Sequence, residues 1–167
     1  MNEVIVASAV RTAIGDFGGA LKDVPPCDLG ATVIRAALER AGVSGDEIGH
    51  VAVGHVINTE PRDMYLSRVA AMNAGIAKET PAFNVNRLCG SGLQAIVSAA
   101  QTILLGDAEI AIGAGAESMS RAPYIAPAQR WGARMGDSVM LDMMTGALSD
   151  PLSLIHISEP TRLGMIS

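Results

Sequence analysis

The first 118 residues alternate between two hydrophobic patterns, one typical of buried strands and the other of helices. Four short apolar runs rich in β-branched or small residues predict strands at 3–10, 50–57, 81–86 and 109–116. Three longer segments between them place apolar residues at helical spacing and meet a Gly at their ends: 28–41, 63–75 and 90–106. This alternation predicts an α/β fold in which parallel strands are joined by right-handed helical crossovers, so that helices cover both faces of a layered sheet.

Two of the predicted helices carry further local signals. Asp28 stands where a side chain caps a helix start, and Gly42 stands where a helix stops. The segment from Leu93 to Leu104 contains no charged residue, and small residues occupy much of the surface that its large aliphatic side chains leave. A helix of this composition is expected to be buried nearly all round.

The composition and the periodicity of the chain change after Glu117. Residues 119–151 contain Pro, Arg, Met and the only Trp and show weak periodicity, which favours an excursion from the sheet such as a lid. Residues 152–167 change again and closely resemble the peptide obtained by translating a sequencing adapter, so we interpret them as not native to the protein. The predicted organisation is therefore an α/β core at 1–118, the start of a loop domain at 119–151 and a non-native tail at 152–167.

Composition limits the classes of function that fit this chain. Its 167 residues are 49% hydrophobic and 17% charged, which is typical of one globular domain with a substantial core. The formal charge of -5 and the lack of Lys- or Arg-rich runs argue against nucleic-acid binding. The first residues lack the basic region of a signal peptide, and no run reaches the roughly 18 uninterrupted apolar residues of a membrane span. We therefore expect a cytoplasmic protein with no nucleic-acid or membrane partner.

The two cysteines, Cys27 and Cys89, are too few for a disulfide framework, so each is either core filler or a reactive group. Cys89 precedes a predicted helix, where free backbone N–H groups and the helix dipole stabilise a thiolate. Gly90 and Gly92 remove side chains beside the sulfur, which leaves room for a substrate and lets backbone N–H groups face its carbonyl oxygen. This pattern suggests a nucleophile elbow for acyl transfer. A lone Cys before a helix is also commonly a small buried hydrophobe, and the local sequence leaves both interpretations open.

A longer pattern favours the catalytic interpretation. The stretch VNRLCGSGLQAI, residues 85–96, resembles the active-site signature of the thiolases, and the resemblance continues through VRTAIGDFGGALKD, NTEPRDMYLSRVAAMNAG and AGAESMSRAPY. It covers about residues 1–150 and is most similar to bacterial acetyl-CoA acetyltransferases and β-ketothiolases, including those that supply polyhydroxyalkanoate synthesis. The resemblance implies the first half of a five-layer fold built from two similar α/β halves, with the Cys-bearing helix at the middle.

In thiolases the Cys that matches Cys89 is the nucleophile that takes the acyl group from an acyl-CoA. A second Cys deprotonates acetyl-CoA, whose carbanion displaces the acyl group to give a 3-ketoacyl-CoA, and thiolysis is the reverse. The resemblance therefore implies a reversible Claisen condensation with acyl-CoA and acetyl-CoA as substrates and no further cofactor. The family's His base, second Cys and oxyanion-site Asn belong to the second half, which has no counterpart in these 167 residues. We therefore expect this chain alone to have negligible turnover.

Several positions beyond Cys89 bear on CoA binding. Leu148, in GALSDP, matches a position that contacts CoA in the family, so the resemblance implies a CoA-binding residue there. His156 falls where the family has the His of an HMG motif, but the Met and Gly that should follow are absent, and we interpret that alignment as accidental. Arg121, Arg130 and Arg134 are candidates to meet CoA phosphates, although exposed arginines are too common to assign them to the site.

The remaining chemistry-bearing residues have structural interpretations. Cys27 follows VPP before a helix and is predicted to be structural. His50 and His55 are five apart on a predicted strand and point to opposite faces, so they do not share a metal, and no metal site is predicted. Arg62 and Asp63 are expected to form a solvated loop pair. The resemblance places that loop near a subunit interface, which favours a role in assembly.

Two alternative functions remain beside the thiolase. A ketoacyl-carrier-protein synthase also uses a Cys elbow, but it lacks the combination of NRLCGSGLQAI with GAESMSRAPY. A non-catalytic module that pairs with another chain is an alternative of a different class, and an exposed apolar face where the second half of the family's fold docks would support it. Family members are homodimers or homotetramers and serve fatty acid metabolism as well as polymer synthesis. The sequence leaves acyl-chain length and the main direction of the reaction open.

Overall fold

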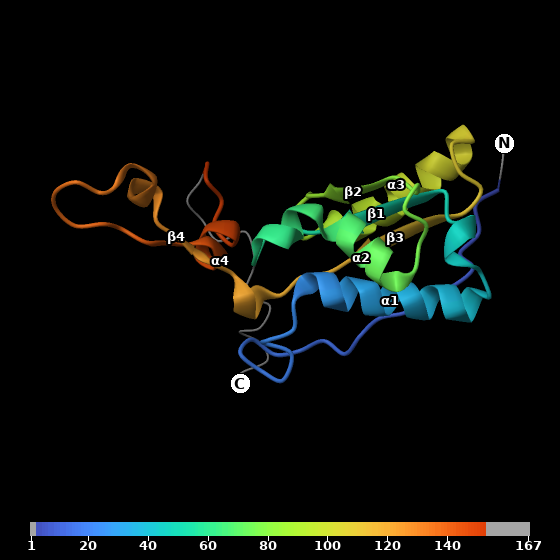
Figure 1. Ribbon diagram of the computed structural model, residues 1–167, viewed down its shortest axis with the longest axis horizontal. Helices are drawn as coiled ribbons and strands as arrows, with labels where there is room; N and C mark the ends of the chain where they lie inside the picture. Colours follow the sequence, from blue (N-terminus) through green and yellow to red (C-terminus); the bar gives the residue numbers. More distant parts are fainter. Residues whose placement is uncertain (1–2, 153–167) are drawn as a thin grey trace. The chain divides into compact units, whose positions relative to one another are not determined.

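The computed structural model of this chain describes residues 3–152 and has an α/β architecture (Figure 1). It divides into two compact units, Met1–Arg121 and Ala122–Ser167. The helices and strands of the first unit are, in chain order, α1 (Pro26–Ala41), β1 (His50–Gly54), α2 (Leu66–Ala74), β2 (Ala82–Val85), α3 (Ser91–Leu105) and β3 (Ala111–Gly115). Short 3-10 turns interrupt them at Gly45–Glu47, Pro61–Tyr65 and Met119–Arg121. The predicted domain boundary after residue 118 stays a prediction.

A three-stranded parallel sheet forms the centre of the first unit, in the order β2-β1-β3. β1 is the middle strand, and its Val51 pairs with Ala82 of β2 on one side and with Ile112 of β3 on the other. Successive side chains of a strand point to opposite faces, so Val51 and Val53 enter the core with α1 and α2, while Ala52 and Gly54 face α3. The predicted parallel α/β sheet with helices on both faces is confirmed.

The main core lies between the sheet and the pair α1 and α2. Gly30 of α1 lets the two helices approach closely, because a Cβ there would lie 3.1 Å from the Ala70 Cβ of α2. Both helices end at a left-handed Gly, Gly42 at φ 66° and Gly75 at φ 92°, as predicted. The buried side chains of this core are mostly small or aliphatic: Cys27, Ala31, Ile34, Leu38, Ile48, Val51, Val53, Leu66, Ala70, Ala71, Ala74 and Ile76.

On the other face of the sheet, α3 lies directly on strand backbone. A Cβ on Gly113 of β3 would lie 2.5 Å from the Cα of Ile96, and a Cβ on Gly54 of β1 would lie 2.5 Å from the carbonyl carbon of Ser91. Real Cβ atoms do not approach backbone so closely, so these two positions require Gly. The close packing of α3 on the sheet, and with it the position of the turn that carries Cys89, depends on these glycines.

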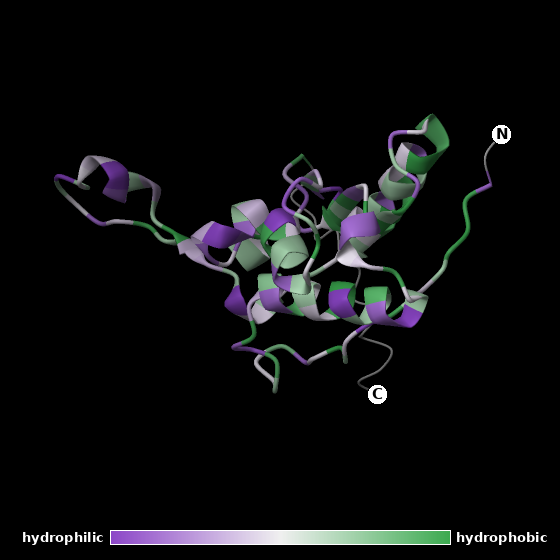
Figure 2. Ribbon diagram, turned by 45° about the vertical axis from the view of Figure 1, so that its right-hand side comes forward, coloured by the Kyte–Doolittle hydropathy of each residue, from purple (hydrophilic) through white to green (hydrophobic). Residues whose placement is uncertain are grey.

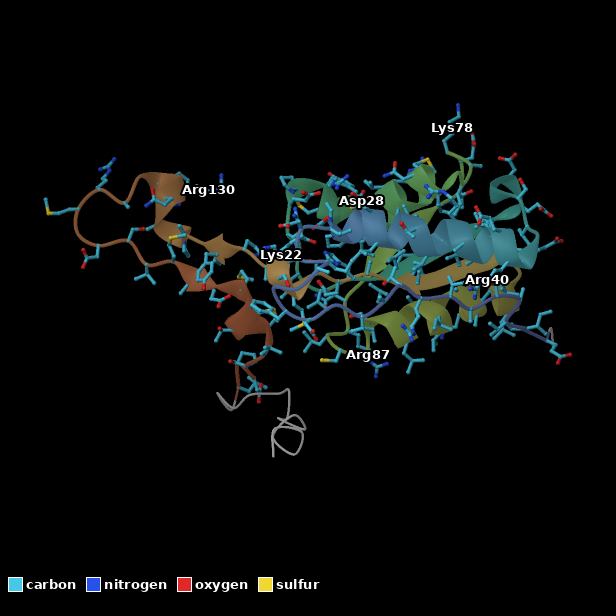
Figure 3. All side chains as sticks on the ribbon, turned by 90° about the horizontal axis from the view of Figure 1, so that it is seen from below. Lys22, Asp28, Arg40, Lys78, Arg87 and Arg130 are labelled. Carbon is cyan, nitrogen blue, oxygen red and sulfur yellow. The ribbon has the colours of Figure 1, made fainter. Side chains whose placement is uncertain are left out.

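The predicted strand at 3–10 is wrong. These residues run as an extended segment outside the sheet, largely green in Figure 2, and Ile5 and Val6 remain 76% and 78% exposed. Arg40, labelled in Figure 3, donates a hydrogen bond from Nη1 to the Ala9 carbonyl at 3.3 Å. A β-branched run favours extended backbone, but a strand also needs a neighbouring backbone for its hydrogen bonds. No strand of the described residues pairs with this segment.

Two expectations about helices are also wrong. Asp28 does not cap α1: Pro25 is the N-cap, and Asp28 lies in the first turn, where its charge still complements the helix dipole. α3 is not buried nearly all round, since only Ser91, Ala95 and Ala99 are buried. Its large apolar side chains are 41% to 77% exposed: Leu93, Ile96, Val97, Leu104 and Leu105. The glycines of the sheet select the small face of α3 for burial, and the described residues supply no second layer over its large face.

In the second unit, β4 (Tyr124–Ile125) and β5 (Leu141–Asp142) pair antiparallel and lead into α4 (Met143–Ala147). Asp142 caps α4, because its side chain accepts hydrogen bonds from the Met144 N–H at 2.8 Å and the Thr145 hydroxyl at 3.1 Å. Between the two strands, a 3-10 turn at Pro127–Trp131 leaves Trp131 83% exposed. The predicted excursion from the sheet is therefore a short hairpin-like segment with little core of its own.

The close seating of α3 predicts the effect of one added methyl group. Gly113→Ala should lower the free energy of unfolding by about 1–3 kcal/mol, the usual penalty of overpacking, because the new Cβ meets helix backbone. Gly92→Ala is the matched control on α3, since a Cβ there meets nothing within 4 Å, and it should leave stability unchanged or slightly higher. Urea unfolding followed by circular dichroism measures both. Equal stability of the two variants would contradict the close-packing argument.

Candidate active site

Cys89 lies in a tight turn between β2 and α3. Leu88, just before it, has φ 48°, a left-handed conformation that Leu rarely adopts and that costs roughly 1–2 kcal/mol. Ser91 spans the turn, because its hydroxyl donates to the Leu88 carbonyl at 2.6 Å and accepts from the Arg87 N–H at 2.8 Å. The side-chain oxygen of Asn86 accepts from the Leu88 N–H at 3.0 Å. Strain held by side-chain hydrogen bonds at the start of a helix is typical of a nucleophile elbow.

The thiol of Cys89 is accessible. Cys89 is exposed, Gly90 is the N-cap of α3, and Gly92 leaves open space where a side chain would stand. Two backbone donors of this turn are already used within it. The Gly90 N–H donates to the Arg87 carbonyl at 3.1 Å and the Ser91 N–H to the Leu88 carbonyl at 3.0 Å. These two donors hold the turn together and do not face an approaching carbonyl oxygen.

Cys27 has the opposite environment, as expected of a structural thiol. It is fully buried, and its S–H donates to Asp63 Oδ1 at 3.3 Å. Burial, and after it the hydrogen bond with Asp63, raises the pKa of Cys27 to about 12. The thiol therefore stays protonated at neutral pH and is no nucleophile.

The solvated pair expected at Arg62 and Asp63 is wrong. Asp63 is fully buried, and its Oδ2 accepts from the N–H and hydroxyl of Thr59, both at 2.7 Å, and from the Glu60 N–H at 3.2 Å. Burial alone would raise the pKa of Asp63, but the hydrogen bonds from Thr59, Cys27 and Glu60 outweigh it and hold that pKa below its ordinary value. Arg62 turns away and pairs with Glu60 and, at 3.4 Å, with Asp28.

The two histidines lie at opposite ends of β1. His50 begins β1, where its Nδ1 is 3.1 Å from the Pro81 carbonyl. His55 follows the other end of β1 and is buried, with Nδ1 2.9 Å from the carbonyl of Ala116. Among residues 3–152, no three His, Cys, Asp or Glu side chains gather as metal ligands would.

The candidate CoA-binding residues lie in the second unit or at its border. Leu148 ends α4, where its N–H donates to the carbonyls of Met144 and Thr145. Arg130 and Arg134 belong to the excursion between β4 and β5, and Arg130 is labelled in Figure 3. Arg121, the last residue of the first unit, donates to Glu60 Oε2 at 3.1 Å and to the Asp23 carbonyl at 3.2 Å. CoA contacts at these residues stay predictions, and His156 lies outside the described residues.

Sequence reasoning missed three residues around the elbow, Asn86, His55 and Glu117. Asn86 carried a usable signal, because Asn two residues before a turn position commonly accepts its N–H. His55 and Glu117 each follow the carboxyl end of a strand. Parallel strands bring those ends to one edge of a sheet, so the pairing of β1 with β3 would have predicted their approach.

A parallel α/β sheet with an exposed cysteine on a strained turn before a helix has the local arrangement that is typical of a nucleophile elbow. The chain belongs to the thiolase family: the model of the thiolase N-terminal domain matches residues 4–162.

Individual relatives agree with this family. The chain is 71% identical over 155 residues to beta-ketothiolase BktB of Cupriavidus necator, a match that covers 93% of this chain and 39% of that protein. It is 46% identical over 158 residues to an acetyl-CoA acetyltransferase of the same organism, covering 94% and 40% of the two chains. A crystal structure of human mitochondrial 3-ketoacyl-CoA thiolase in complex with CoA superposes with a TM-score of 0.87 at 38% identity, covering 91% and 39%. The chain thus spans about two-fifths of the length of these relatives.

The two cysteines predict a selective labelling pattern. Iodoacetamide at pH 7 should alkylate Cys89 and leave Cys27 unmodified, because Cys89 is exposed while Cys27 is buried with its pKa raised to about 12. Peptide mass spectrometry locates the label. Cys89→Ser should abolish labelling of the folded chain and Cys27→Ser should not change it. Equal labelling of both thiols under native conditions would contradict this site.

Proposed function

We propose that this chain carries the nucleophile of a thiolase, and that Cys89 accepts the acyl group of an acyl-CoA. The observation that carries the proposal is an exposed thiol on a strained turn at the start of α3. Family membership and the identity to beta-ketothiolase BktB support it.

The proposed step is acyl transfer. The Cys89 thiolate attacks the thioester carbonyl carbon, an S–C bond forms, and the tetrahedral intermediate collapses as the C–S bond to CoA breaks. CoA leaves as a thiolate and takes up a proton, and the acyl group remains as a thioester on Cys89. The carbanion of a second acetyl-CoA then displaces it to give a 3-ketoacyl-CoA.

The complete reaction needs groups beyond those of this chain, which spans about two-fifths of its relatives' length. The second step requires a base for the acetyl-CoA methyl group, and the family's second Cys and His have no counterpart in these residues. We therefore infer that the chain alone supports at most the acylation half-reaction. The homodimer or homotetramer, the cytoplasmic location and the service to fatty-acid or polyhydroxyalkanoate metabolism are proposals for the whole protein.

Acylation and turnover give separate readouts. Incubation with radiolabelled acetyl-CoA should place label on Cys89, and Cys89→Ser should remove it while Cys27→Ser retains it. Acetoacetyl-CoA thiolysis by the same preparation should be at least 100-fold below that of a full-length thiolase, because losing even one oxyanion donor typically costs about 100- to 1,000-fold. Thiolysis near the full-length rate would contradict the inferred half-reaction, and lack of label on Cys89 would contradict the proposed nucleophile.

A second candidate function, a module that pairs with another chain, is favoured by the exposed apolar face of α3. This face consists of Leu93, Ile96, Val97, Leu104 and Leu105. By length and composition, the stretch Leu88–Leu105 would also be able to cross a membrane, but core helices of soluble proteins pass the same test. We interpret the face as a protein interface, since the match covers only 39% of relatives such as beta-ketothiolase BktB, whose remaining chain is long enough to cover such a face.

An uncovered apolar face should make the isolated chain associate. Light scattering during size-exclusion chromatography should show a mass above that of the 17.2 kDa monomer, rising with concentration. The double variant Ile96→Glu with Leu105→Lys should reduce the association, since it places opposite charges on the face. Met135→Lys is the control, because Met135 is 97% exposed and belongs to the other unit. A monomeric chain at all concentrations would argue against this second function.

A further inference from the structure

We propose that His55 is a positioning residue for Cys89, acting through a chain of hydrogen bonds that joins the ends of all three strands. The proposal rests on the proposed function only in taking Cys89 as the reactive thiol. His55 lies just past β1, the middle strand, at the carboxyl edge where the Cys89 turn also lies.

The ring of His55 is held by the end of β3. Its Nδ1 is 2.9 Å from the Ala116 carbonyl and 3.4 Å from Glu117 Oε1. Both neighbours accept hydrogen bonds, so Nδ1 carries the proton and donates. The side chain is only 2% exposed, and Nε2 has no hydrogen-bond partner among the described residues. The Nδ1 contact therefore fixes the ring.

The backbone that follows His55 is held by the same end of β3. The carboxylate of Glu117 accepts from the Val56 N–H at 2.8 Å and from the Ile57 N–H at 3.2 Å. Together with the His55 ring, these bonds fix three successive residues past β1. A carboxylate that accepts two backbone N–H groups is a stronger anchor than a neutral acceptor.

From β1 the contacts continue into the Cys89 turn. The His55 N–H donates to the Val85 carbonyl at 3.1 Å, at the end of β2. The Val56 carbonyl accepts from Asn86 Nδ2 at 3.5 Å, and the other side-chain atom of Asn86 holds the N–H of strained Leu88. Hydrogen bonds, together with the peptide bond between His55 and Val56, thus connect the end of β3 to Leu88, the residue before Cys89.

The contact of Gly54 with α3 explains why the position of the neighbouring His55 affects Cys89. A Cβ on Gly54 would lie 2.5 Å from the Ser91 carbonyl carbon, so the residue before His55 already touches the first turn of α3. A shift of the β1 end therefore moves the start of α3 relative to the turn that carries the sulfur. The helix N-terminus stabilises a thiolate only while its N–H groups keep their direction.

The test measures alkylation of Cys89 by iodoacetamide at pH 7, where the buried Cys27 is expected not to react. His55→Asn places an amide donor near the Nδ1 position, and His55→Gln places it near Nε2. His55→Gln should slow alkylation by about two- to fivefold, the range that a helix N-terminus is worth to a charge at its first turn. His55→Asn should stay near the unmodified rate, and so should His50→Gln, the control at the other end of β1.

Asn86→Asp supplies a second variant that does not disturb the core, since Asn86 is exposed and Asp keeps the acceptor for Leu88. It removes the donor to Val56, so His55→Gln should have no further effect in that background. Additive effects would overturn the proposal, as would equal rates of the two His55 variants or recovery by Gln and not by Asn. If His55→Gln does not fold, the test rests on Asn86→Asp, which removes the hydrogen bond between Asn86 and the Val56 carbonyl. A wild-type alkylation rate for this variant would overturn the proposal.

Failure of this proposal is distinguishable from failure of the proposed function. Cys89 that is alkylated in the expected pattern but takes no label from acetyl-CoA would leave the positioning role intact and remove the acyl-transfer role. If instead Cys89 is acylated while His55→Gln and Asn86→Asp leave its alkylation rate unchanged, the acyl-transfer role would stand and the positioning role would be removed.

Discussion

The backbone of α3 lies against β1 and β3 because two of the strand positions that face it, Gly54 and Gly113, carry no side chain. Gly54 and Gly113 leave room for helix backbone at distances that any Cβ would violate. This contact sets the height of the helix start above the sheet, and the strained Leu88 is the bend that the chain needs to reach it from β2. The exposure of Cys89 follows from this arrangement, since the turn stands above the carboxyl edge of the sheet.

The same contact determines which face of α3 remains uncovered. Because the backbone of α3 lies so close to the sheet, only small side chains fit between them. Ala95 and Ala99 therefore face the sheet, and the large aliphatic residues face outward. A helix with one small face and one large apolar face belongs between two layers. The sequence predicted burial on both sides from composition, which is a property of the complete fold. These described residues supply only one of the two layers.

Periodicity and Gly positions predicted the three helices, three of the four strands and the helix ends at Gly42 and Gly75, because these depend on contacts close in sequence. Whether the apolar run at 3–10 forms a strand could not be predicted in this way, since strand pairing depends on which backbone lies beside the run. The buried Asp63 was missed for the same reason. Its partners Thr59 and Cys27 become neighbours only when the 3-10 turn at Pro61–Tyr65 packs on α1.

The two thiols have opposite environments, although both lie near the start of a helix. Cys27 and Cys89 both precede or begin a helix, so helix position alone does not distinguish them. Cys27 is enclosed by core side chains beside a carboxylate, which stabilises the protonated form. Cys89 stands outside the core on a turn held by Asn86 and Ser91, and it is exposed. The surroundings of the two helix starts therefore differ where their position in the sequence does not, and the hydrogen bonds of His55 and Glu117 connect the surroundings of Cys89 to the sheet.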